Sequence, residues 1–155
     1  MSGRIEARLK QLGIELPEPA APVANYVPFT ISGNLVFVSG QICVWNGERR
    51  FVGKLGAGIG VAEGQQAARL CVLNILAQLR VACGGDLDRV RRCLRLGGFV
   101  NCTHDFTDMP QVVNGASDLM VEVFGDAGRH ARAAVGNSSL PGGVAVEVEG
   151  TFEIG

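Results

Sequence analysis

The sequence has no excess of charge of either sign. Lysine and arginine number 14 and aspartate and glutamate 15, which gives a formal net charge of -1. A nearly neutral surface has no overall field with which to attract the phosphates of nucleic acid or an anionic membrane. We therefore expect neither nucleic acid nor a membrane surface among the partners of this protein.

Closely spaced metal ligands are also lacking. The chain has five cysteines and two histidines, and no two cysteines are spaced Cys-x-x-Cys. Structural zinc sites group their ligands more tightly than this. An odd number of scattered cysteines is typical of small buried hydrophobic residues in a reducing compartment. We expect no metal site and no cofactor.

Long apolar runs are absent. None approaches the roughly 20 residues of a membrane span, and residues 2–11 carry charges where a secretory leader would be apolar. With 47% hydrophobic and 19% charged residues the composition excludes disorder, and 155 residues suit one ordinary domain. These features predict a cytoplasmic, globular protein.

The first 25 residues are expected to precede the main domain, which we place at 26–155. Apolar residues at helical spacing predict a short amphipathic helix that Gly13 ends: Ile5, Leu9 and Leu12. Residues 16–28 contain four prolines and are expected to form an extended connector.

The remaining pattern predicts an α+β domain. Strands are expected at 29–32, 35–41, 90–100, 131–135 and 144–154, and helices at 61–82 and 108–124, the second with Asp108 as its N-cap. In the first helix one broad apolar face is expected, formed by Ala67, Leu70, Cys71, Asn74, Leu76, Leu79 and Val81. Hairpins at both ends, the first turning at Gly33-Asn34, exclude a purely parallel sheet. Two helices would cover one face of the sheet, and the other face, if apolar, would be buried against further copies of the chain.

Few residues suggest chemistry by themselves. The glycine-rich stretch 56–60 lacks the Lys-Ser/Thr of a phosphate loop and is interpreted as a surface loop. Arg132 interrupts an apolar strand, so it lies either at a sheet rim or ready to bind a carboxylate. Glu147 and Glu149 share one strand face, which is either simply solvated or, if sheet pairing joins it to Arg132, holds a general acid/base. His104 and His130 are interpreted as ordinary loop or surface residues.

Three stretches resemble the Rid (reactive intermediate deaminase) family, also called YjgF or endoribonuclease L-PSP proteins. The N-terminal hairpin is represented by Tyr26-Val27, Gly33-Asn34 and Val38-Ser39-Gly40-Gln41-Ile42. The first helix and its following turn are represented by residues 66–74 and Gly85-Asp86-Leu87. The C-terminal motif is represented by Ala131-Arg132, Leu140-Pro141 and Val146-Glu147-Val148-Glu149.

The resemblance implies a chorismate-mutase-like fold assembled as a homotrimer with clefts between subunits. It further implies cofactor-independent hydrolysis of carboxylate-bearing enamines and imines, such as 2-aminoacrylate, to a 2-keto acid and ammonia. In that comparison Arg132 holds the substrate carboxylate and Glu147 positions the attacking water. Tyr26, Ser39 and Asn114 line the cleft.

Several departures from the family pattern indicate a divergent branch. Where the family often has Pro-Ala-Arg-Ser and then cysteine, this chain has His130, Ala133 and Ala134 in place of the proline, serine and cysteine. The loop before Asn114 is longer by about a residue in that comparison, and the first 25 residues are an addition. Two alternatives stay open: a non-catalytic trimer that binds a small carboxylate, and a ribonuclease, against which the neutral charge argues.

Overall fold

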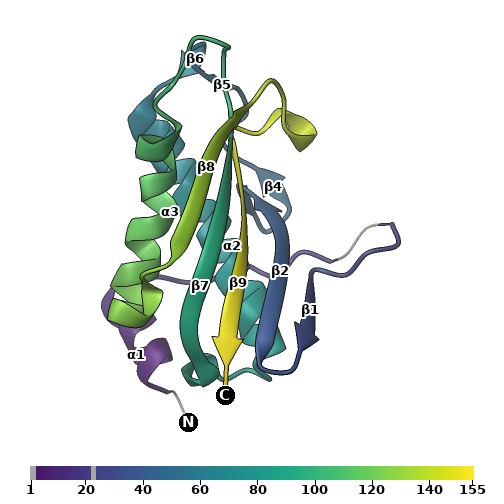
Figure 1. The fold of residues 1–155 in the computed structure, drawn as a ribbon, viewed down its shortest axis with the longest axis vertical. Helices are drawn as coiled ribbons and strands as arrows, with labels where there is room; N and C mark the ends of the chain where they lie inside the picture. The colour runs from purple at the N-terminus through teal and green to yellow at the C-terminus, as the bar shows by residue number, and fades with distance from the viewer. Residues whose placement is uncertain (1–2, 22–23) are drawn as a thin grey trace.

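In the computed structural model, which describes residues 3–21 and 24–155, one five-stranded sheet forms the centre of the molecule. Its strands are β1 (Phe29–Ser32), β2 (Leu35–Ile42), β7 (Val90–Asn101), β8 (Ala131–Asn137) and β9 (Val146–Ile154), in the spatial order β1-β2-β9-β7-β8. Helices α2 (Val61–Ala82) and α3 (Met109–Phe124) pack on each other and on one face of this sheet (Figure 1). The predicted α+β fold with two helices on one face is confirmed.

The smaller elements lie between and around these. They are α1 (Arg4–Gln11), β3 (Val44–Trp45), β4 (Glu48–Arg49), β5 (Lys54–Leu55), β6 (Gly58–Ile59) and the 3-10 turns η1 (Leu87–Arg89), η2 (Gly125–Gly128) and η3 (Pro141–Gly143). The glycine-rich stretch 56–60, predicted to be a surface loop, includes the short strand β6 as well as the turn before it, and it leads into α2. Residues 22 and 23 of the predicted connector lie outside the described residues.

Helix boundaries follow the sequence closely. α2 covers the predicted range, and Gly84 and Gly85 after it have positive φ angles of 66° and 94°, which suit a helix C-terminus. Asp108 occupies the N-cap position of α3, as predicted, although its side chain makes no capping hydrogen bond. Pro110 in the first turn has no backbone N–H, so one of the groups that a capping side chain could bind is missing.

The predicted C-terminal hairpin does not form. β9 lies between β2 and β7 and is antiparallel to both, whereas β8 pairs only with β7, in parallel, at the edge of the sheet. In β9 every second residue is fully or almost fully buried, so a central place between two strands buries more apolar area than an edge would. The alternation predicted from the sequence is confirmed, but β9 begins at Val146 instead of Val144.

The register of the sheet decides which side chains face the helices. Val146, Val148 and Phe152 of β9 point into the core and are fully buried. Glu147 and Glu149 point to the opposite face, which neither α2 nor α3 covers. Phe37 and Val135 share that uncovered face and are 44% and 45% exposed. The face is therefore mixed, with apolar residues beside carboxylates, and not uniformly apolar.

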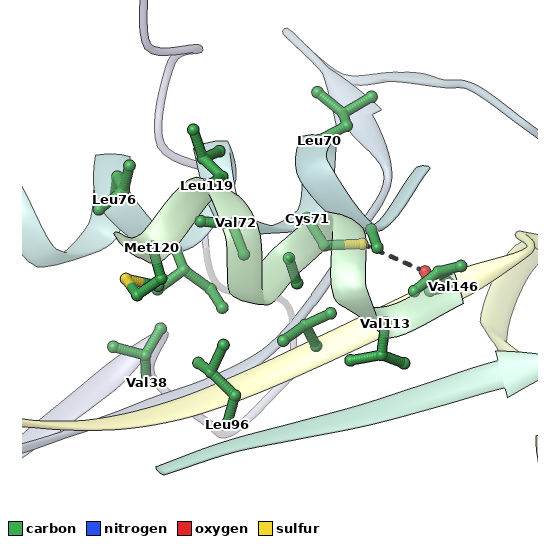
Figure 2. Packing of buried hydrophobic residues seen from close by; sticks show 14 of the residues in the cluster. Val38, Leu70, Cys71, Val72, Leu76, Leu96, Val113, Leu119, Met120 and Val146 are labelled. Carbon is green, nitrogen blue, oxygen red and sulfur yellow. Dashed lines mark hydrogen bonds between the residues drawn. The ribbon is translucent and has the colours of Figure 1, made fainter. Parts of the chain in front are cut away.

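The core lies between the helices and the covered face of the sheet. Figure 2 shows side chains of α2, α3 and the strands meeting there, among them Val72, Leu119 and Leu96. The thiol of Cys71 donates to the carbonyl oxygen of Val146 at 3.3 Å, which ties α2 to β9 (Figure 2). Most of the predicted apolar face of α2 is buried here, but Val81, next to the C-terminal end of the helix, is 52% exposed.

The N-terminal helix belongs to the same packed body. Ile5 and Leu9 of α1 are 1% and 2% exposed, and the helix contacts α3 and η1. Its first backbone N–H groups, of Arg4 and Ile5, donate to the two carboxylate oxygens of Asp88 at 2.9 and 2.8 Å. The predicted amphipathic helix is confirmed, and Asp88 takes the capping role that the N-cap residue Gly3 cannot fill.

Candidate functional site

A cavity of about 380 Å³ opens beside Glu147, between β2, the connector and α2. Three of the predicted site residues line it: Tyr26, Ser39 and Glu147. Much of the remaining wall is apolar, with Ala20, Ala21, Pro28, Ile42, Val44 and Pro141. The sequence-based grouping of Tyr26, Ser39 and Glu147 therefore corresponds to one place in the fold.

The position of Ser39 and Gly40 comes from an irregularity in β2. The register between β2 and β9 shifts between Val38 and Gln41, which is typical of a β-bulge. Ser39 at the bulge binds the connector, because its hydroxyl donates to the carbonyl oxygen of Pro28 at 3.1 Å. The bulge thus brings the connector, and with it Tyr26, against the cavity.

The carboxyl group of Glu147 lies directly over Gly40. A Cβ atom at residue 40 would come within 2.9 Å of the Glu147 Cδ atom, so only glycine leaves room for the carboxyl group there. Partial burial, and after it the charge of Glu149, raises the pKa of Glu147 above its usual value of 4.5. Among the described residues nothing donates a hydrogen bond to this carboxyl group. Its oxygens are available to a water or a ligand in the cavity.

A second cluster surrounds Arg132 at the edge of the sheet. One guanidinium nitrogen, Nη1, donates to Asn114 Oδ1 at 2.8 Å and to Ser117 Oγ at 3.1 Å, both on α3. Within residues 3–21 and 24–155, no acceptor is bound to Nη2 or Nε, and no carboxylate forms an ion pair with Arg132. The structure thus brings Arg132 and Asn114 together, as their predicted shared role requires.

Ser117 and His130 extend this cluster. His130 Nδ1 lies 2.7 Å from the carbonyl oxygen of Gly128, which can only accept, so Nδ1 carries the hydrogen. Nε2 is then an acceptor and lies 2.8 Å from Ser117 Oγ, whose hydroxyl donates to it. His130 lies in the loop directly before β8, as predicted, but it is half-buried and hydrogen-bonded on both ring nitrogens.

Sequence patterns held a signal for these two residues. Ser117 follows Asn114 by three positions, which places both on one face of a helix. His130 precedes Arg132 by two positions, a spacing that puts side chains on one face of an extended chain. The sequence patterns did not indicate that α3 and β8 meet at this edge of the sheet.

The two clusters lie on opposite faces of the sheet. Arg132 is opposite Leu96 of β7, a fully buried residue on the helix-covered face, whereas Glu147 is opposite Phe99, three positions along the same strand. The expectation that sheet pairing joins the glutamates to Arg132 is wrong, because β7 separates β8 from β9. Glu149 pairs instead with Arg95, at 3.4 Å. One copy of the chain therefore carries two separate clusters, one around Glu147 and one around Arg132.

The part of the chain that the structure describes has neither a cluster of metal ligands nor a membrane-spanning helix. No group of three or more metal-ligating side chains comes together anywhere in the described part of the chain. None of the helices that the structure describes is long and apolar enough to cross a membrane.

Comparisons with known proteins agree with this architecture. Protein TCP17 of Trypanosoma cruzi is 49% identical over 154 residues, covering 99% of this chain and 96% of its own. The crystal structure of Atu1372, a protein of unknown function from Agrobacterium tumefaciens, is 50% identical, with a TM-score of 0.90 over 97% of this chain and 93% of that one. A Shewanella oneidensis protein described as a "putative endoribonuclease" is 40% identical, with a TM-score of 0.93 over 98% and 100% of the two chains.

The match to a protein family covers nearly the whole domain. Residues 6–148 match the family described as "YjgF/chorismate mutase-like, putative endoribonuclease". The match begins within α1 and ends in β9, so it includes Glu147, Arg132 and the residues around each of them. The resemblance inferred from the sequence is thereby confirmed, and the chain belongs to the YjgF/chorismate mutase-like family.

Proposed function

We propose that this protein is a cofactor-independent deaminase that hydrolyses carboxylate-bearing enamines and imines to a 2-keto acid and ammonia. The observation that carries the proposal is the state of the Arg132 guanidinium. It is fixed through Nη1 alone, it has no carboxylate partner among the described residues, and two of its nitrogens are left to a ligand. A planar guanidinium presented in this way suits the two oxygens of a carboxylate.

Glu147 supplies the second group that the reaction needs. Hydrolysis forms a bond between a water oxygen and the imine carbon and breaks the bond between that carbon and nitrogen. In this proposal Glu147 accepts the proton from the attacking water and returns it to the departing nitrogen. A carboxyl group whose pKa is raised exchanges protons near neutral pH more readily than an ordinary glutamate, which supports this role.

The reaction requires two copies of the chain in this proposal. Arg132 and Glu147 point to opposite faces of one sheet, so a substrate held by both must lie between neighbouring copies. One subunit supplies Tyr26, Ser39 and Glu147, and its neighbour supplies Asn114 and Arg132. The uncovered sheet face, with Phe37 and Val135 exposed, offers apolar area for such an assembly, which we propose to be a homotrimer.

The proposal is tested by a coupled assay in which a dehydratase generates 2-aminoacrylate or a bulkier enamine. Wild-type protein should accelerate the release of keto acid and ammonia, and Arg132→Ala should abolish the acceleration without changing the oligomeric state. Arg129→Ala is a matched control, because Arg129 is an exposed arginine three positions away whose ion pair is with Asp126. Equal rates for wild type and Arg132→Ala across a panel of enamines would overturn the deaminase proposal.

Two other possible functions can be tested with wild type and the same Arg132→Ala variant. A non-catalytic carboxylate-binding trimer would show a ligand-induced rise in Tm that depends on Arg132, without turnover. Ribonuclease activity, suggested by the description of the Shewanella protein, is disfavoured because the two histidines lie at opposite ends of the β7–β8 pair. RNA cleavage that survives repurification and is lost in Arg132→Ala or Glu147→Gln would favour it instead.

A further inference from the structure

We propose that Ser117 and His130 form a positioning relay that holds Arg132 ready for a carboxylate and releases it when His130 is protonated. This inference rests on the proposed role of Arg132 as the carboxylate anchor. It adds two residues and a pH-dependent control to that site.

The relay is a chain of hydrogen bonds with one direction. The Gly128 carbonyl accepts from His130 Nδ1 at 2.7 Å, His130 Nε2 accepts from the Ser117 hydroxyl at 2.8 Å, and Ser117 Oγ accepts from Arg132 Nη1 at 3.1 Å. Because the hydroxyl hydrogen of Ser117 is directed at His130, its oxygen lone pairs are left for Arg132. Each member thereby fixes the donor or acceptor role of the next.

The consequence for Arg132 is orientation. An arginine side chain is long and flexible, and a free guanidinium at a sheet edge loses much conformational entropy when it binds a ligand. Two acceptors on Nη1, Asn114 Oδ1 and Ser117 Oγ, fix the plane of the guanidinium before a ligand arrives. The remaining nitrogens, Nη2 and Nε, are then available together for the two oxygens of a carboxylate.

Protonation of His130 reverses one bond of the relay. A protonated Nε2 donates to Ser117 Oγ, so the hydroxyl hydrogen of Ser117 loses its acceptor, and the two cationic groups, His130 and Arg132, repel each other. The pKa of His130 is lowered from its usual value of 6.5, first by burial and then by the charge of Arg132, against an opposing hydrogen bond to Gly128. The neutral imidazole that the relay needs is therefore the form present at neutral pH.

The other charged groups near His130 do not compensate its protonation. Arg129 and Asp126 of the η2 region pair with each other at 3.2 Å, and Arg92 of β7 donates to the Arg129 carbonyl. α3 contributes the neutral Ser117, and β8 contributes Arg132. No carboxylate in the described part of the chain makes a hydrogen bond to the imidazole.

The first experiment measures binding of pyruvate, a 2-keto acid, and of pyruvamide, which has the same shape without the carboxylate charge. Ser117→Ala should weaken pyruvate binding by about tenfold, as expected for one hydrogen bond to a charged group, and leave pyruvamide binding unchanged. Ser117→Thr keeps the hydroxyl and should bind pyruvate within about twofold of wild type. A merely structural role for Ser117 would weaken both ligands equally, which would overturn the relay.

The second experiment addresses the pH dependence. In wild type, pyruvate affinity should fall as pH drops through the pKa of His130, read from imidazole NMR signals in a chain with only two histidines. His130→Gln keeps an acceptor near the position of Nε2 without a titrating charge, so its affinity should match wild type at neutral pH and lose the acid-side fall. His130→Ala should bind pyruvate weakly at all pH values. An unchanged acid-side fall in His130→Gln would overturn the switch.

The two proposals fail separately. If Arg132→Ala leaves pyruvate binding unchanged, the carboxylate anchor itself is wrong and the relay has no function. If Arg132→Ala abolishes binding while the Ser117→Ala and His130→Ala variants bind as wild type with unchanged Tm, the anchor stands and the relay is wrong.

Discussion

Arg132 and Glu147 lie two strands apart on one sheet and direct their side chains to opposite faces of it. The residues opposite them on β7 are Leu96 and Phe99, whose separation of three positions fixes this alternation. A single ligand cannot reach both groups of one chain without passing through the sheet. The relationship makes the assembly of copies, and not the single chain, the unit of the proposed activity.

Complementation between inactive variants tests this directly. Arg132→Ala and Glu147→Gln should each be inactive alone, but subunits mixed by denaturation and refolding should regain activity, because some clefts then join an intact Arg132 to an intact Glu147. With random assembly from equal amounts, about one quarter of the clefts would be intact. Refolding each variant by itself is the control. If mixed oligomers form without any recovery, the site lies within one chain.

Gly40 is expected to be essential for the position of Glu147. Gly40→Ala adds a methyl group where the Glu147 carboxyl group lies, so that group must shift from its present position. We expect a drop in kcat of at least about tenfold, typical of the loss of a positioned acid/base group. Pyruvate should still bind to this variant, because Arg132 is unchanged. Gly60→Ala is the matched control, because the same methyl group there meets no atom within 4 Å. An active Gly40→Ala variant would remove Glu147 from the mechanism.

Glu147 should make stability fall as pH rises. Because its folded pKa is raised, the folded protein binds more protons than the unfolded chain between the usual value of 4.5 and the folded pKa. The free energy of unfolding therefore decreases as pH rises through that window. Glu147→Gln lacks this effect and should gain Tm relative to wild type above about pH 4.5, with the difference constant once pH exceeds the folded pKa. The prediction is checked by measuring the Tm of wild type and Glu147→Gln from pH 4 to 8. A Tm difference between them that does not change with pH would contradict the raised pKa.

Asp88 is expected to anchor α1 to the rest of the domain. Asp88→Ala removes the acceptors for the Arg4 and Ile5 N–H groups, a loss comparable to that of a helix N-cap, about 1 kcal/mol. For a chain of this size that corresponds to a fall in Tm of about 2–4 °C, with faster hydrogen exchange in α1 than in α2. Asp86→Ala is an informative comparison, because its carboxylate caps η1 only. Unchanged exchange in α1 would show that Ile5 and Leu9 hold the helix without the cap.

The pH dependence of Asp88 has the opposite sign to that of Glu147. Hydrogen bonds from the backbone N–H groups of Ile5 and Arg4 lower the pKa of Asp88. Its contribution is therefore present above the usual value of 3.8 and is lost as pH falls through the lower folded pKa. The Tm of Asp88→Asn should therefore approach that of wild type in strongly acidic solution, which thermal unfolding at a series of acidic pH values would measure.

The sequence by itself determined the elements and most of their boundaries. Periodicity placed α2 at its observed ends, and the Gly33-Asn34 turn placed the first hairpin, because these patterns depend on residues close together in the chain. The family resemblance selected Tyr26, Ser39 and Glu147, which the fold brings to one cavity, and Asn114 with Arg132, which it brings into hydrogen-bond contact. Their roles in binding and catalysis stay predictions.

Only the tertiary structure decided how these local pieces meet. The insertion of β9 between β2 and β7, which replaced the expected C-terminal hairpin, depends on contacts between residues about 45 to 120 positions apart. The same long-range pairing sets Arg132 and Glu147 on opposite faces and places His130 of one segment beside Ser117 of another. No local pattern encodes such proximity, since it arises from burying the apolar faces of β9, α2 and α3 together.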